Sequence, residues 1–251
     1  MRLLTPILLT LCLGQLAFGK AKKETKDFQA GLKLEQYEYL EPSIDVQHKG
    51  LLYGVWGEWL WGSALGNGRT TGDLVTGTID YSGGYYEAGN YFPDTATTFD
   101  VITKVSSRLE YPVAPGANIF AGLGARYLYD LGNKSYFYRR TGKWVFIPLG
   151  GNIELETSIG KIFFDLQYDF IVYGNMHSQL SDAIPAPDVD HSQSGSGLSL
   201  TAGLQNEQYS AALFYEKWSL NESNTVVADG VPYIEPENSS TAVGLKLGYK
   251  F

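Results

Sequence analysis

The sequence predicts an all-β protein, a closed antiparallel transmembrane β-barrel of about ten strands, with eight strands as the alternative count. Three observations favour this fold class: an N-terminal segment typical of exported proteins, several long segments in which apolar and polar residues alternate, and connections that are short and long in turn. Alternation gives a strand one apolar and one polar face, and a membrane barrel turns the apolar face to lipid.

The first nineteen residues have the pattern of a secretory signal peptide. Arg2 gives a positively charged start, a broken apolar stretch follows, and small residues at Ala17 and Gly19 provide a cleavage site. An anchoring helix is the alternative, and the shortness of the stretch with its Thr, Pro, Gly and Gln residues argues against it. We therefore expect a signal peptide over residues 1–19, a periplasmic leader over 20–27 and an outer-membrane barrel over 28–251.

Composition excludes several classes of function. The 251 residues carry a formal net charge of −8, whereas a nucleic-acid partner calls for a basic face. Cys12 lies inside the expected signal peptide and is the only cysteine, so thiol chemistry and cysteine-based zinc sites are not expected in the processed chain. No cofactor is expected either.

The strands are clearest between residues 99 and 130. In FDVITKVSSRLEY, the apolar positions from Phe99 to Tyr111 alternate with charged or small ones, and IFAGLGARYLYD repeats the pattern after a tight turn. Each run exceeds the roughly 9–11 residues that a tilted membrane strand needs. Similar alternation continues in WVFIPLGGNIELE, IFFDLQYDFIVYG, GLSLTAGLQ, YSAALFYEKW and STAVGLKLGYKF, and three weaker runs precede it in FQAGLKLEQYEYL, GLLYGVWGEWLW and RTTGDLVTGTIDYSG.

The connections alternate in length. Short turns are expected near residues 61–68, 112–118, 157–161 and 206–208, and longer polar loops near 42–49, 82–98, 131–142, 175–195 and 220–238. Membrane barrels have short periplasmic turns and longer outer loops. Both chain ends would then lie on the periplasmic side.

The last strand ends on an aromatic residue, Phe251, with Tyr249 on the same face. An unpaired strand edge in hydrocarbon costs several kcal/mol for each backbone group, so this strand is expected to pair with the first. With this feature the chain resembles the small single-chain outer-membrane barrels of Gram-negative bacteria. The resemblance implies that Tyr249 and Phe251 form the signal read by the outer-membrane barrel assembly machinery, and that outer-membrane lipid surrounds the strands.

Aromatic residues are expected to form girdles at the two membrane interfaces, because their rings and polar tips favour that depth. The candidates fall mostly towards the ends of the expected strands. They are Trp56, Trp59, Trp61, Tyr81, Tyr111, Tyr127, Tyr129, Trp144, Tyr168, Tyr173, Tyr215, Trp218 and Tyr249.

The polar faces collect charges that we expect to line the lumen. These charges either fill a narrow lumen as a plug of paired side chains or line a small aqueous pore, and a barrel of about eight strands is just filled by its own side chains. A structural or porin-like role, as a narrow passive pore with surface-exposed loops, is therefore the main functional expectation. The expected lumen residues are Lys33, Glu35, Glu58, Asp80, Lys104, Arg108, Glu110, Arg126, Glu154, Asp165, Asp169, Glu216 and Lys246.

An enzyme at the outer rim is the alternative function. The omptin proteases also have ten strands, and their site pairs two acids with an Asp-x-His motif; here His191 directly follows Asp190, so that motif is absent. A lipid- or peptide-processing site would need His near Ser and an acid. We expect all three histidines in outer loops, His177 and His191 near Ser178, Asp182 and Ser192, but assign no catalytic residue. The spacing of these histidines with Asp188 or Asp190 matches no metal-binding motif.

Overall fold

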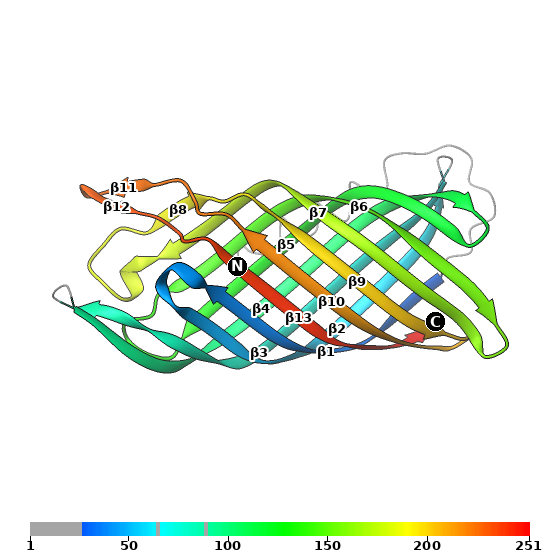
Figure 1. Ribbon diagram of the computed structural model, residues 1–251, viewed down its shortest axis with the longest axis horizontal. Helices are drawn as coiled ribbons and strands as arrows, with labels where there is room; N and C mark the ends of the chain where they lie inside the picture. Colours follow the sequence, from blue (N-terminus) through cyan, green and yellow to red (C-terminus); the bar gives the residue numbers. More distant parts are fainter. Residues whose placement is uncertain (1–26, 64–65, 88–89) are drawn as a thin grey trace.

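The computed structural model describes residues 27–63, 66–87 and 90–251 (Figure 1). The expected signal peptide over 1–19 and nearly all of the leader lie outside these residues. Ten strands form one antiparallel ring in the order β1, β2, β3, β4, β5, β6, β7, β9, β10 and β13, which closes where β13 pairs with β1. The predicted fold class is therefore confirmed, with ten strands and not eight.

Nine of the ten ring strands are longer than the roughly 9–11 residues that a bilayer requires, and β9 has 11. Their bounds are β1 Asp27–Glu41, β2 Val46–Ser63, β3 Gly66–Glu87, β4 Asn90–Ala114, β5 Ala117–Gly132, β6 Arg139–Thr157, β7 Gly160–Gln179, β9 Gly195–Gln205, β10 Tyr209–Leu220 and β13 Asn238–Lys250. Three short strands, β8 Val189–Ser192, β11 Val226–Ala228 and β12 Val231–Tyr233, and the 3-10 helices η1 Pro42–Ile44 and η2 Leu180–Asp182 complete the described elements. No helix among the described residues has the length and apolar character needed to cross a membrane.

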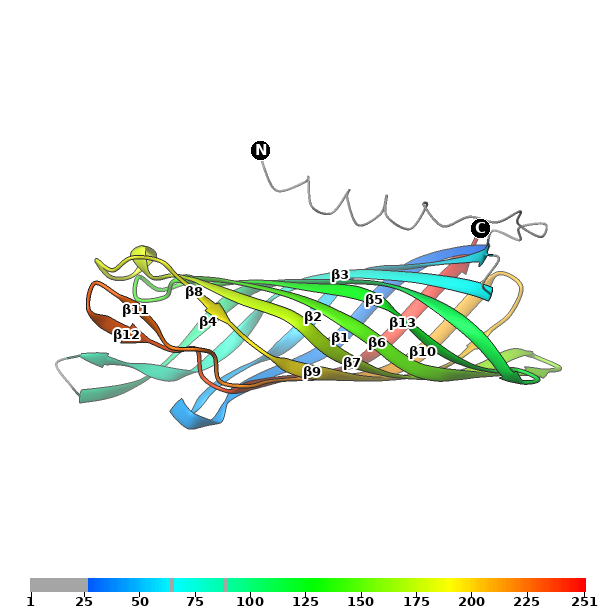
Figure 2. The same ribbon diagram turned by 90° about the horizontal axis from the view of Figure 1, so that it is seen from above.

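The two ends of the barrel differ, and we call them the turn end and the loop end. At the turn end β1 begins, β13 finishes and tight turns join β4 to β5 and β6 to β7. At the loop end lie η1, η2, β8 and the β11–β12 hairpin, and the β3–β4 hairpin projects there as well (Figures 1 and 2).

Several expected outer loops are strands in the structure. Residues 46–49 belong to β2, and the 82–98 segment is mostly the end of β3 and the start of β4. His48 therefore lies in β2, His177 in β7 and His191 in β8, not in loops. The prediction failed because a strand beyond the bilayer keeps its ladder of hydrogen bonds while presenting polar residues outside, such as Asp80 and Ser82, so the alternation that marks a membrane strand disappears.

The outer surface carries an apolar band that ends before the strands do. On β1 the outward side chains Phe28, Leu32 and Leu34 are exposed, and further along the strand the outward positions are Gln36 and Glu38. Such a continuous exposed apolar belt is suited to lipid rather than to water. The loop-end part of the barrel thus stands clear of the hydrocarbon.

Aromatic residues flank the band, though not all of those predicted. Trp59, Tyr111, Tyr209 and Tyr249 lie within a few residues of the turn end of their strands. The prediction was wrong for four others, because the pleat turns Trp56, Tyr81, Trp144 and Trp218 into the lumen. Position near a strand end was used for these aromatics without regard to which face of the strand they occupy, and Trp218 on β10 shares its face with Phe214 and Glu216.

The closing seam holds the C-terminal residue in place. The Phe251 amide donates a hydrogen bond to the Phe28 carbonyl at 2.9 Å, and the Lys250 ammonium forms an ion pair with Asp27 at 3.0 Å. The Phe251 ring packs against Phe28 and Tyr249, with centroids 5.7 and 5.1 Å away. The first and last strands are therefore joined by backbone, charge and ring contacts.

Candidate functional site

The lumen is the candidate site, and its turn-end mouth is a network of ion pairs. The Arg69 guanidinium contacts Glu58 at 3.0 Å, Glu110 at 2.7 Å and Glu154 at 3.2 Å. Arg108 also contacts Glu110, at 3.0 Å, and forms an ion pair with Asp165. The two guanidinium groups thus bridge carboxylates from strands on different sides of the barrel, as bidentate Arg geometry allows.

The charges continue towards the middle of the barrel. Lys33 contacts Glu35 at 2.9 Å and Asp73 at 3.1 Å, and Lys104 pairs with Glu216. Lys246 has no carboxylate within 4 Å among the described residues; its ammonium lies 5.3 Å from the centre of the Phe214 ring and 5.8 Å from that of Trp56. An aromatic face stabilises a cation at this distance.

Twelve of the thirteen charged residues expected in the lumen face inward. Asp80 is the exception: it is exposed on the outer face of β3, because Ile79 and Tyr81 take the inward positions. The others face inward, namely Lys33, Glu35, Glu58, Lys104, Arg108, Glu110, Arg126, Glu154, Asp165, Asp169, Glu216 and Lys246.

A cavity of about 110 Å³ lies among the turn-end charges, lined by residues that include Arg69, Lys104, Arg108 and Glu216. One water needs roughly 10–15 Å³ of such volume. The cavity therefore has room for several waters within a polar network.

An apolar plug fills the lumen beyond these charges. Leu52, Val75, Trp144, Phe146 and Trp218 are at most 1% exposed and belong to one buried cluster. The rings of Phe146 and Trp218 meet edge to face, with centroids 5.3 Å apart. Sequence reasoning missed this plug because it looked for charges on the inward faces.

Glycines on neighbouring strands make room for the inward rings. A side chain at Gly124 would meet the Phe146 ring at 2.3 Å, and one at Gly244 would meet the Phe214 ring at 2.8 Å. Aromatic side chains covering cross-strand glycines are a recognised way to fill and curve a barrel. Inward glycines beside inward aromatics were the signal in the sequence that could have revealed the plug.

Beyond the plug, the loop end encloses a polar chamber. Arg140 contacts Glu41 at 2.8 Å and Glu235 at 2.6 Å and donates a hydrogen bond to the Tyr39 hydroxyl at 2.6 Å. Arg126 forms the chamber floor, with its guanidinium 5.2 Å from the Trp144 ring and 5.0 Å from the Trp218 ring. Of the charged residues here, Arg126 alone was predicted from the sequence to line the lumen.

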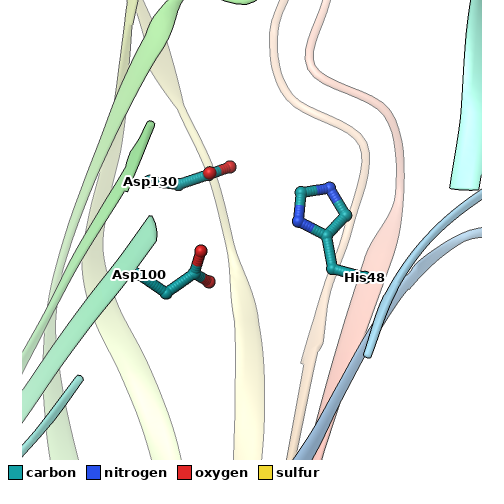
Figure 3. Close-up of side chains that lie close together, drawn as sticks. All are labelled: His48, Asp100 and Asp130. Atoms are coloured by element: carbon teal, nitrogen blue, oxygen red, sulfur yellow. The ribbon is translucent and has the colours of Figure 1, made fainter. Parts of the chain in front are cut away.

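His48, Asp100 and Asp130 meet in the same chamber. Asp100 and Asp130 are direct cross-strand partners on β4 and β5, and their carboxylates point towards His48 on β2 (Figure 3). The donor atoms of the three side chains all lie within 4.8 Å of one another. These residues lie far apart in sequence, and the expectation that His48 lay in a loop hid the cluster.

The residues considered for a rim enzyme do not form one site. His177 Nδ1 lies 3.2 Å from Asp190 on the outside of the barrel, whereas Ser178 and His191 point inward. The Ser223 hydroxyl lies 3.3 Å from His191 Nδ1, but it donates to the Asn224 carbonyl and accepts from the Glu235 amide. This hydroxyl is thus held by the backbone and is not positioned as a nucleophile.

Asp182 belongs to an exterior contact instead. Its carboxylate accepts hydrogen bonds from the Arg139 guanidinium at 2.7 and 3.0 Å. These bonds hold the pKa of Asp182 below its ordinary value. The contact anchors η2 to the start of β6.

Comparison with known proteins supports the fold. No family model matches the chain, and no curated protein matches it. The structure of the outer membrane protease OmpT from Escherichia coli superposes with a TM-score of 0.51 and 11% sequence identity, covering 92% of this chain and 99% of that one.

Weaker matches include two other proteins. The toluene transporter TodX of Pseudomonas putida gives a TM-score of 0.37 at 9% identity, covering 92% of this chain and 90% of that one. The translocator domain of the autotransporter NalP of Neisseria meningitidis gives a TM-score of 0.38 at 10% identity, covering 98% of this chain and 94% of that one. The chain has the closed, ten-stranded fold of the outer-membrane β-barrels, and no single family of barrels is assigned to it.

Proposed function

We propose that this protein is a sealed structural barrel of the outer membrane that presents its loop end at the cell surface, and that it does not conduct solutes. The observation that carries the proposal is the apolar plug. Phe146, Trp144 and Trp218 occupy the lumen between the turn-end charges and the loop-end chamber. A narrow barrel filled by its own side chains has no continuous water path.

The paired charges support the same function. A conducting pore keeps its lining charges hydrated so that solutes can exchange with them. Here the guanidinium groups of Arg69 and Arg108 form ion pairs with carboxylates across the lumen. The cavity beside them has a volume of only about 110 Å³. The network therefore acts as cross-bracing of the wall.

The narrow passive pore is the competing function, and planar-bilayer recording separates the two. The purified wild-type protein should insert without stable conductance steps. The double variant Phe146→Ala and Trp218→Ala, which removes the two central rings of the plug, should give small steps. Steady steps from the wild type would overturn the proposal.

The matched control is Phe170→Ala, which removes the same side chain from the lipid-facing side of β7. It should remain silent. Heat-modifiable migration on a gel shows for each variant that the barrel has folded, so silence cannot be mistaken for misfolding.

We also infer that Tyr249 and Phe251 are read by the barrel assembly machinery during insertion. Phe251 is 75% exposed at the seam, so its ring is available to a partner. Phe251→Ala should lower the amount of folded protein in the outer membrane while leaving spontaneous refolding into detergent unchanged. Equal losses in both assays would assign Phe251 to the stability of the seam alone.

A further inference from the structure

We propose that His48, Asp100 and Asp130 form a binding site for one divalent transition-metal ion, of the Zn²⁺ class, inside the loop-end chamber. The three side chains come from β2, β4 and β5 and converge on one point (Figure 3). The site is independent of whether the lumen conducts.

Geometry is the first support. The donor atoms lie within 4.8 Å of one another. Ligand bonds of about 2.0–2.2 Å let one ion join donors up to about 4.4 Å apart. Small rotations of the side chains therefore complete the site without moving the strands.

The chamber's charge balance is the second support. Among the described residues, the chamber holds four buried carboxylates, Glu41, Asp100, Asp130 and Glu235, and two guanidinium groups, Arg126 and Arg140. Arg140 is paired with Glu41 and Glu235, and Arg126 lies over two tryptophan rings. Both guanidinium groups therefore attract Asp100, and Arg140 attracts Asp130, only from beyond ion-pair distance. A doubly charged cation beside Asp100 and Asp130 offsets the remaining negative charge.

The unpartnered state of Asp130 is the third support. Its side chain is 7% exposed, points into the cluster and makes no hydrogen bond or ion pair within 4 Å to any residue that the structure describes. A buried carboxylate without a partner is costly. Its direct neighbour across the ladder is a second carboxylate, Asp100, which raises that cost further.

The surroundings hold the imidazole in place. The His48 ring lies edge-on to the rings of Tyr39 and Tyr81, with centroids 5.2 and 5.1 Å away. His48 Nδ1 lies 3.2 Å from the Thr98 hydroxyl, which in turn donates to Asp100 at 3.0 Å. Such outer contacts orient metal ligands and fix their tautomers.

The donor set selects the class of ion. Calcium takes six to eight oxygen ligands, whereas this site offers one imidazole nitrogen and two carboxylates. One nitrogen and two carboxylate donors suit Zn²⁺ and its first-row neighbours. The exterior beside His48 is polar, with Gln47, Lys49 and Asp80 facing out, whereas Phe99 and Leu131 face out beside Asp100 and Asp130. The site therefore lies at the loop-end edge of the apolar band.

Calorimetric titration of the folded full-length barrel with ZnCl₂ tests the site, after treatment with a chelator and its removal. The wild type should bind one ion per chain with high affinity. Asp130→Asn and His48→Gln should each weaken that affinity by at least about 100-fold. The control is His177→Gln, which alters the exterior His177–Asp190 contact and should leave the high-affinity ion in place.

Spectroscopy of the wild type keeps the proposal testable should Asp130→Asn fail to fold. Co²⁺ added to the wild-type barrel should give the visible absorption of a low-symmetry nitrogen–oxygen site, and one equivalent of Zn²⁺ should abolish it. If the wild type binds no ion with high affinity, the proposal is overturned, and the two carboxylates of Asp100 and Asp130 share a proton instead of a metal ion. Affinity unchanged in Asp130→Asn or His48→Gln would overturn it as well.

Discussion

The two halves of the lumen handle buried charge in different ways. At the turn end, Arg69 and Arg108 each contact more than one carboxylate, and Glu110 accepts from both of them and from Asn152. At the loop end, Asp100 and Asp130 face each other with no cation within 4 Å among the described residues. The apolar plug separates the two halves.

Paired and unpaired buried charges have different consequences for the barrel. A buried charge whose partners are all supplied by the chain is satisfied in the folded state and adds to the rigidity of the wall. A buried charge without such partners is retained at a cost in stability, which a bound ligand removes. The Arg69–Arg108 network at the turn end therefore braces the wall, whereas the Asp100–Asp130 pair in the loop-end chamber is the place where we propose that an ion binds.

The largest effect is expected from Arg69→Met. The change leaves the carboxylates of Glu58, Glu110 and Glu154 without their shared cation inside the lumen. Removing one partner of a buried ion pair costs about 3–5 kcal/mol. Urea unfolding in lipid vesicles, followed by tryptophan fluorescence, measures the loss.

Lys49→Met is the control for that change. Lys49 is exposed and pairs with Glu38 at 3.3 Å on the outside of the barrel. Surface pairs are worth about 0–1 kcal/mol. If Arg69→Met costs no more than this control, the turn end is not braced by its charges.

Neutralising one carboxylate should have opposite effects in the two halves. Glu110→Gln weakens the hydrogen bonds that Arg69, Arg108 and Asn152 donate to this side chain. The free energy of unfolding should therefore fall by about 1.5–3 kcal/mol. Asp130→Asn removes a like charge facing Asp100, so in the presence of a chelator it should stabilise the barrel by about 0.5–1 kcal/mol. The same urea assay measures both changes in unfolding free energy. If the two variants change it in the same direction, the two halves of the lumen do not differ in how they stabilise buried carboxylates.

The smallest effect is expected from Asp182→Asn, outside the lumen. The pKa of Asp182 is depressed by its bonds to Arg139, so its contribution is present above the ordinary carboxyl pKa and is lost as the pH falls through the depressed value. The exposed contact should affect only local order in η2. Amide hydrogen exchange of residues 180–182 should speed up in the variant at neutral pH while the exchange of β6 and β7 strand amides stays unchanged.

Much of the ring was predictable because alternation is strong where strands cross lipid. Val101, Val105 and Leu109 face out and Lys104 and Arg108 face in, as the period of two requires. The strand count followed from such runs and from the alternating turn lengths. Prediction failed at the loop end, where β3 and β4 carry polar residues outside and the hydrophobic pattern no longer distinguishes strand from loop.

The cluster of His48, Asp100 and Asp130 was less predictable, because these side chains meet only through the register in which the strands pair. Asp100 and Asp130 become neighbours only through the β4–β5 pairing, and His48 joins them across the chamber. Asp80 was assigned to the wrong face because its strand contains several glycines and polar residues on both sides. A shift of one residue exchanges the two faces, so a weak pattern leaves the assignment open.

Closure of the ring is the claim on which the sealed lumen and the chamber both depend, and a disulfide across the seam tests it most directly. Ala30 and Tyr249 are Cα partners between β1 and β13. Ala30→Cys combined with Tyr249→Cys should cross-link under mild oxidation in the folded barrel, and the cross-linked form should resist unfolding. The pair Ala30→Cys with Val243→Cys should stay reduced. Failure of the first pair to cross-link in folded protein, or equal cross-linking of both pairs, would contradict the closed barrel.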